Sequence, residues 1–207
     1  MNTPVYTPGW RRRDWVRLAS GAGLGLLLSR PTLANDFWRL AQVGGHVFLM
    51  RHARTEPGIG DPPGFQLGNC RTQRNLSDVG RADATALGQR FRAEGVALDR
   101  VLSSAWCRCT DTAALAFDPH YPRHEVWPAL NSFFQGQGDG ARQTAAVMER
   151  LLSVQAPTNW MLVTHQVNIT ALTGEVPAMG EVFLVKPPKP GEQRLAVRAR
   201  WQPTRTG

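Results

Sequence analysis

The sequence predicts one α/β domain, a three-layer α/β/α sandwich whose sheet is mostly parallel with an antiparallel edge at the C-terminal end. Short continuous apolar runs alternate with longer segments in which apolar residues recur at helical spacing, which is typical of this class. Two last apolar runs flank a Pro/Gly turn, which favours an antiparallel hairpin. The 207 residues, 42% hydrophobic and 19% charged, suffice for one core of ordinary size.

The first half of the domain contains two expected strands and a helix. The apolar run 45–50 has the form of a buried parallel strand and ends in Arg51-His52. Residues 55–73 are rich in Gly and Pro, which predicts a long loop able to cover a substrate. Ser77 is a suitable N-cap for a helix that ends at Gly95, and a second strand is expected over 100–104.

The second half continues the alternation of helices and strands. A short helix is expected over 109–117, followed by a strand around 124–130 and a helix over 141–154. The apolar run 159–164 predicts another strand, which stops directly before His165. Segments 182–186 and 195–201 are expected to form the antiparallel hairpin that closes the sheet edge.

Residues 1–34 have the features of an export signal, which leaves 35–207 as the folded domain. Three arginines precede a weakly apolar stretch, 18–28, and small residues lead up to Ala34. The segment 12–17 resembles the twin-arginine pattern, while an ordinary secretory signal and an uncleaved anchor are the alternatives. The apolar run is too short to span a bilayer comfortably. We therefore expect a periplasmic or secreted bacterial protein with no stable membrane span after signal removal.

The positive charge of the chain is concentrated at its two ends. Removal of residues 1–34 takes away five arginines and one aspartate, which reduces the formal charge from +8 to +4. Much of the remainder lies near the C-terminus, beside prolines and in the expected hairpin. This distribution favours a solvated basic face over a nucleic-acid groove, so no nucleic-acid partner is expected.

The three cysteines do not form a metal-binding pattern. Cys70, Cys107 and Cys109 fit no zinc spacing, so no metal is expected. An oxidising compartment permits a disulfide from Cys70 to either of the other two. Three small buried side chains are an equally good interpretation, and the sequence does not decide between them.

Polar groups follow three of the expected strands. They are Arg51-His52, then Ser103-Ser104 leading to Arg108, and finally His165. In open α/β sheets the ligand crevice lies outside the carboxyl ends of the strands, where these groups converge. Guanidinium forks match phosphate oxygens, so the composition predicts a site for a compact anion. Taken singly, each of these residues is more often a structural histidine or a surface arginine.

Four ordered segments, 49–53, 72–82, 103–113 and 163–168, also carry a family resemblance. Leu-Met-Arg-His-Ala, the Asn-Leu-Ser-Asp-Val-Gly helix start, Ser-Ser-Ala-Trp-Cys-Arg-Cys-Thr-Asp-Thr-Ala and Val-Thr-His-Gln-Val-Asn resemble motifs of the histidine phosphatase superfamily. This group contains phosphoglycerate mutases and acid phosphatases. The order and spacing hold from about residue 45 to residue 185, and the resemblance implies a phosphoglycerate mutase-like fold.

The resemblance also implies roles for the polar residues. His52 is expected to attack phosphorus and become a phosphohistidine, which divides one difficult transfer into two easier ones. Arg51, Arg108 and His165 are expected to bind the phosphoryl oxygens. Arg54 is a further candidate for a phosphate contact, with a solvated loop cation as its alternative. No cofactor is implied.

The chain departs from the family where a proton donor is usual. Gln166 follows the second histidine, and Asn131 and Ser132 follow the middle strand, so neither usual carboxylic acid is present. Glu56, Glu125 and Asp139 remain, and Glu56 is the possible acid because it lies closest in sequence to His52. Without an acid, substrates with good leaving groups are expected to react best.

These inferences predict a phosphatase that acts on a small phosphorylated substrate or an envelope phosphate compound. The more specific likeness is to small exported bacterial members, including lipopolysaccharide core heptose phosphatases. The alternative is a catalytically reduced phosphate-binding or regulatory protein of the same fold, which kept the anion site and lost the acid.

Overall fold

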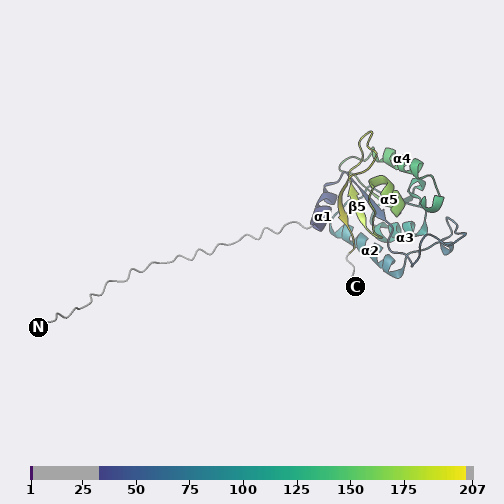
Figure 1. Cartoon of the computed structure of the whole chain (residues 1–207), viewed down its shortest axis with the longest axis horizontal. Helices are drawn as coiled ribbons and strands as arrows, with labels where there is room; N and C mark the ends of the chain where they lie inside the picture. Colours follow the sequence, from purple (N-terminus) through teal and green to yellow (C-terminus); the bar gives the residue numbers. More distant parts are fainter. Residues whose placement is uncertain (2–32, 204–207) are drawn as a thin grey trace. The chain divides into compact units, whose positions relative to one another are not determined.

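The computed structural model describes Met1 and residues 33–203 (Figure 1). The expected export signal, 1–34, lies outside the described residues apart from Met1 and its last two, which begin helix α1 (Leu33–Val43). The expected cleavage point after Ala34 therefore falls in the first turn of α1. No helix among the described residues combines the length and apolar character that a membrane crossing requires.

Six strands form one sheet in the order β3-β2-β4-β1-β5-β6. Neighbours from β3 through β2 and β4 to β1 pair in parallel, whereas β5 pairs antiparallel with both β1 and β6. The mostly parallel sheet with an antiparallel C-terminal edge is thus confirmed, and among the described strands β5 runs against the other five. The strands are β1 (His46–Arg51), β2 (Arg100–Ser103), β3 (Glu125–Val126), β4 (Asn159–Thr164), β5 (Val182–Val185) and β6 (Val197–Trp201).

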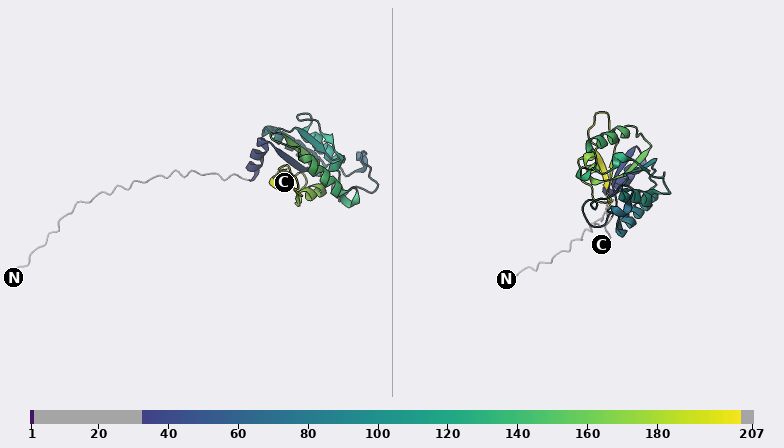
Figure 2. Two further views of the ribbon diagram at one scale, coloured as in Figure 1. Left: turned by 90° about the horizontal axis from the view of Figure 1, so that it is seen from above. Right: turned by 90° about the vertical axis from the view of Figure 1, so that its right-hand side faces the viewer.

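Helices cover both faces of this sheet, which gives three layers (Figure 2). Helices α1, α2 (Asp78–Ala93) and α3 (Cys107–Phe117) bury Phe37, Phe91 and Phe117 against one face. Helices α4 (Gly140–Leu151) and α5 (Gln166–Thr173) bury Leu151 and Ile169 against the other. Because both faces are covered, β4 is buried along its whole length, as its continuous apolar run predicts.

The boundaries of helix α2 follow from local sequence signals. The side chain of Ser77 accepts a hydrogen bond from the backbone N–H of Gly80, as expected of an N-cap. The helix ends just before Gly95, whose φ of 66° is the left-handed conformation that glycine adopts without steric cost. Gly80 is required for a second reason, since an added Cβ would lie 1.9 Å from the carbonyl oxygen of Arg54.

Three elements differ from the sequence-based expectations. The sequence pattern does not predict helix α5, because this segment lacks the polar stripe that marks an amphipathic helix. The structure nevertheless buries its Ile169 and Leu172. Helix α1 begins where the signal was expected to end. The strand expected over 124–130 is only the two residues of β3, because the chain turns at Pro128 into the short 3-10 helix η2 (Pro128–Leu130). Two more 3-10 turns are η1 (Cys70–Thr72) and η3 (Phe134–Gly136).

Candidate active site

The parallel register brings the expected polar groups to one edge of the sheet. Arg51 and Thr164 are paired at the ends of β1 and β4, and the next N–H, that of His52, donates to the carbonyl of Thr164 at 3.0 Å. The rings of His52 and His165 consequently lie side by side, 5.6 Å between their centroids. On the other side of β4, the N–H of Ser104 donates to the carbonyl of Val163, which places the start of α3 at the same edge.

These groups line a cavity of about 250 Å³. His52, His165, Arg51 and Arg108 all contribute to it, so the structure brings together the four residues expected to be catalytic. Arg74 also lines the cavity, and Asp61 is the carboxylate among its lining residues. With neutral histidines, three guanidinium groups and one carboxylate leave two net positive charges, which matches a phosphoryl dianion.

His52 is held as a neutral imidazole with a free nitrogen. Its side chain is buried, and Nδ1 lies 2.9 Å from the carbonyl oxygen of Ala53. A carbonyl oxygen only accepts, so Nδ1 carries the proton and Nε2 keeps its lone pair. Burial lowers the pKa of His52 well below its usual value, and Arg108 lowers it further. The ring is therefore neutral at neutral pH, and its Nε2 has the free lone pair that a nucleophile requires.

His165 is fixed by the loop that follows β2. Its Nε2 lies 2.8 Å from Oγ of Ser104, a shorter contact than the 3.3 Å from that hydroxyl to Asn131. Burial lowers the pKa of His165 well below its usual value, and the neighbouring His52 and Arg108 lower it further. The thiol of Cys109 lies 3.5 Å from the same nitrogen, and burial raises the pKa of that thiol to about 12, so it stays protonated.

The guanidinium groups crowd one another and keep unused donors. Burial lowers the pKa of Arg51, and the charges of Arg74 and Arg108 add to that effect. Nη1 of Arg51 donates to the carbonyl of Pro177 at 3.0 Å, but the buried Nε of Arg51 and of Arg108 has no hydrogen-bond partner among the described residues. Cations held together with buried, unpaired N–H donors form a binding site for an anion.

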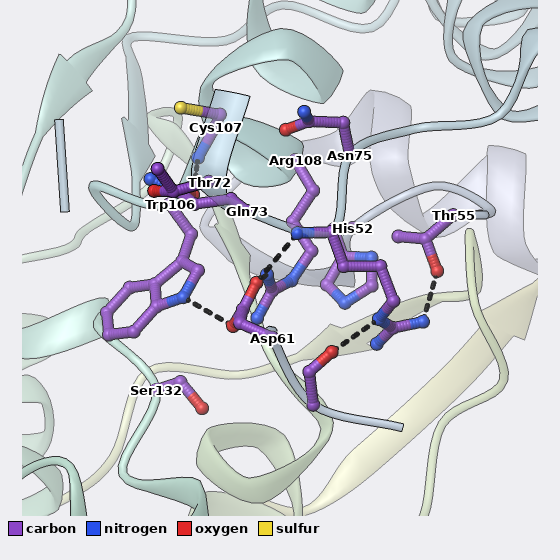
Figure 3. Close-up of polar contacts among 12 residues, drawn as sticks. His52, Thr55, Asp61, Thr72, Gln73, Asn75, Trp106, Cys107, Arg108 and Ser132 are labelled. Carbon is purple, nitrogen blue, oxygen red and sulfur yellow. Dashed lines mark hydrogen bonds and ion pairs between the residues drawn. The ribbon is translucent and has the colours of Figure 1, made fainter. Parts of the chain in front are cut away.

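Asp61 is bound to the start of α3 by several donors (Figure 3). Its carboxylate accepts hydrogen bonds from Nη1 of Arg108 at 2.8 Å and from the indole N–H of Trp106 at 2.9 Å. The backbone N–H of Arg74 also donates to it, at 3.0 Å. Both side chains of the Asp61–Arg108 pair are about 5% exposed, so this ion pair is sheltered from solvent.

Residues 47–145 match the family described as the histidine phosphatase superfamily (branch 1). The chain belongs to this superfamily. The matched segment contains Arg51, His52 and Arg108 but ends before His165, which the parallel pairing of β1 and β4 brings to the same site.

Several solved histidine phosphatases have the same fold as this chain. The protein histidine phosphatase SixA complexed with tungstate is 18% identical, with 76% of this chain and 97% of that chain covered at a TM-score of 0.52. The alpha-ribazole phosphatase from Shigella flexneri is 19% identical over 74% and 95%, at 0.51. A mycobacterial glucosyl-3-phosphoglycerate phosphatase is 16% identical over 74% and 97%, at 0.54. At these identities the likeness establishes the fold alone. A comparison with curated proteins finds no match.

A disulfide ties the loop that follows His52 to the helix that carries Arg108. Cys70 and Cys107 are bonded, which decides the pairing that the sequence left open, and Cys109 is a buried free thiol. The side-chain carbonyl of Gln73 accepts from the N–H of Cys107 at 2.9 Å. The segment that supplies Asp61 and Arg74 is thus anchored one residue before Arg108.

Other residues considered from the sequence lie away from the cavity. Arg54 donates two hydrogen bonds to Asp83, at 2.6 and 2.9 Å, and does not line the cavity, so the expected phosphate contact finds no support in the geometry. Glu56 is exposed and is also absent from the lining, which leaves the possible acid unsupported. Glu125 pairs with Arg100, and Asp139 caps α4.

Sequence analysis missed Asp61 and Arg74 as members of the site. Asp61 lies in a Gly/Pro-rich loop with no motif around it, and Arg74 precedes the helix-start motif without being part of its pattern. The available signal was that Asp61 and Glu56 are the two carboxylates between His52 and Ser77. Within the described part of the chain, no group of three or more His, Cys, Asp and Glu side chains is arranged to hold a metal ion.

Proposed function

We propose that this chain is a phosphatase that hydrolyses a phosphate compound through a phosphohistidine on His52. The observation that carries the proposal is the neutral, buried His52, whose Nδ1 proton is committed to Ala53 while the ring lines a cavity with three guanidinium groups. Attack by Nε2 forms the P–N bond as the bond to the leaving oxygen breaks, and water then hydrolyses the intermediate.

Arg51, Arg108 and His165 supply the electrostatic part of this mechanism. Charge on the equatorial phosphoryl oxygens is redistributed in the transition state, and donors already held in place stabilise it without reorganising. The unpaired Nε–H groups of Arg51 and Arg108 are such donors. Each of these donors should lower the activation free energy by roughly 3 to 4 kcal/mol, which is typical of a single oxyanion-hole donor.

The rim of the cavity favours an uncharged leaving group. Ile59 is 87% exposed and Phe134 is 39% exposed, and both line the cavity. Met179 and the amides of Gln137 and Gln166 complete a surface without further cations. A small phosphorylated compound, or the phosphorylated end of an envelope component, fits this combination of a cationic floor and a neutral rim.

We further propose that residues 1–34 export the domain to the periplasm or beyond by the twin-arginine route. The Arg12-Arg13 pattern supports the route, and the Cys70–Cys107 disulfide is the kind of bond that an oxidising compartment preserves. Replacing both arginines by lysine should retain the full-length chain in the cytoplasm. Unchanged appearance of a shortened chain in the periplasmic fraction would exclude this route.

The phosphatase proposal is tested with p-nitrophenyl phosphate and purified residues 35–207. His52→Ala should abolish turnover, whereas His120→Ala, which changes an exposed histidine, should match the wild type. Equal rates for wild type and His52→Ala would refute the enzyme. Tungstate binding that persists in that case would support the phosphate-binding alternative, which the intact cluster of guanidinium groups also permits.

A further inference from the structure

Departure of an alkoxide requires a proton donor that the expected positions do not supply. Gln166 and Ser132 line the cavity, and neither an amide nor a hydroxyl protonates a leaving group effectively. His165 is neutral because burial lowers its pKa. Of the described residues that line the cavity, Asp61 alone carries a carboxyl group.

The position of Asp61 suits the leaving-group side of the reaction. His52 is 3% exposed and forms the floor of the cavity, so in-line attack directs the leaving oxygen toward the mouth. The residues just before Asp61, from Gly58 to Gly60, line that mouth, and Ile59 among them is largely exposed. Figure 3 shows the side chain of Asp61 next to those of Trp106 and Arg108.

The partners of Asp61 control its protonation. Burial is the largest influence and raises its pKa, but hydrogen bonds from Arg108, the backbone N–H of Arg74 and Trp106 together hold the pKa below the usual value. Without substrate the group is therefore ionised. The charged groups that face it are Arg108 from α3 and Arg74 from the segment before α2, while the nearby Cys109 thiol stays neutral.

A phosphoryl dianion changes this balance because it competes for the same guanidinium. Arg108 is the strongest single partner that opposes the effect of burial on Asp61. When Arg108 donates its unpaired Nε–H to a phosphoryl oxygen, its charge is shared between two anions and Asp61 gains a negatively charged neighbour. Burial then dominates, the pKa of Asp61 rises, and the carboxylate takes up a proton as the substrate binds.

We propose that Asp61 is the proton donor for the leaving group, a role that rests on the phosphatase function proposed above. In the first step Nε2 of His52 bonds to phosphorus, the P–O bond breaks, and the leaving oxygen takes both the electron pair and the proton of Asp61. In the second step water attacks phosphorus and gives its proton to Asp61, while the P–N bond breaks and its electron pair returns to His52. Alcohol and phosphate are released, and Asp61 is protonated again.

Two substrates that differ in leaving group test this role. p-Nitrophenolate departs without help, whereas the alkoxide of glycerol 2-phosphate does not. Asp61→Asn keeps the shape of the side chain and an acceptor for Trp106. It should lower kcat/KM for glycerol 2-phosphate by about 10² to 10⁴-fold and that for p-nitrophenyl phosphate by less than about tenfold. Glu56→Gln, which removes the other carboxylate of the same loop, should change neither value.

An equal loss for both substrates would overturn the proposal, since Asp61 would then only position Arg108. Selective loss in Glu56→Gln instead would assign the role to Glu56. Failure of the proposed function is distinguishable, because the wild type would then be no faster than His52→Ala on either substrate.

Binding of tungstate provides a readout that does not depend on turnover. Titration calorimetry in buffers of different ionisation enthalpy counts the protons taken up per anion bound. The wild type should take up more protons than Asp61→Asn at neutral pH, with a difference approaching one. Equal proton uptake by two proteins that both bind tungstate would overturn the inference whatever their activities.

Discussion

Removal of the Cys70–Cys107 disulfide should destabilise the protein strongly and weaken its anion site. The two cysteines are 37 residues apart, and loop-closure entropy for a ring of that size amounts to about 4 kcal/mol at 25 °C. This is a large fraction of the 5 to roughly 15 kcal/mol that stabilises an ordinary domain. The bond also anchors the segment with Asp61 next to Arg108, so the double variant Cys70→Ser/Cys107→Ser should bind tungstate more weakly.

Urea unfolding followed by tryptophan fluorescence measures the effect. The double variant should lose about 3 to 4 kcal/mol in the free energy of unfolding at an unchanged m-value. A thiol reductant should bring the wild type to the same midpoint and leave the variant where it is, because the variant has no disulfide to lose. A variant within about 1 kcal/mol of the oxidised wild type would refute the reasoning.

Three more predictions concern packing, charge recognition and pH. Gly88→Ala would place a Cβ 1.8 Å from the carbonyl oxygen of Ala116, so α2 and α3 must separate. Urea unfolding should show a loss of about 1 to 3 kcal/mol in the free energy of unfolding, and unchanged stability would contradict this packing. Arg108→Lys loses the planar guanidinium that serves both Asp61 and the phosphoryl group. Its kcat/KM for p-nitrophenyl phosphate should therefore fall at least about 100-fold, and a change under threefold would argue against a phosphoryl contact by Arg108. The pKa of His52 and of His165 is lowered in the folded state, so both rings bind protons more readily in the unfolded chain. Their contribution to the free energy of unfolding is fully present above the unfolded-state pKa near 6.5. It decreases as the pH falls below that value, by up to about 1.4 kcal/mol per pH unit for each ring. Between pH 7.5 and 5.5 His52→Gln should therefore lose less stability than the wild type, and an equal loss would contradict the lowered pKa.

The sequence predicts the sheet and the core of the site because both depend on local patterns. A continuous apolar run such as 159–164 forms a buried strand wherever helices cover both faces. Since parallel strands end at one edge, residues that follow them, such as His52 and His165, come together without knowledge of any long-range contact. The expected helix start at Ser77 is confirmed for the same reason, since a cap depends on a few neighbouring residues.

The parts that sequence analysis missed depend on distant contacts. Asp61 is recognisable as a site residue only through Arg108, 47 positions later, and Trp106. Arg54 was expected near phosphate because it is two residues from His52, but Asp83 in α2 provides a closer partner for its guanidinium. Helix α5 is eight residues long and buries the polar Asn168 and Thr173 together with Ile169 and Leu172, so its sequence lacks the separate polar and apolar faces on which periodicity depends.

The central claim is that the imidazole of His52 forms a covalent bond to phosphorus. Rapid mixing with p-nitrophenyl phosphate, an alkaline quench after milliseconds and mass spectrometry of the digested protein locate the phosphate directly. The account predicts an acid-labile, base-stable phosphate on the peptide that contains His52, present in Asp61→Asn and absent from His52→Ala. Phosphate on the His165 peptide, or full turnover by His52→Ala, would contradict it.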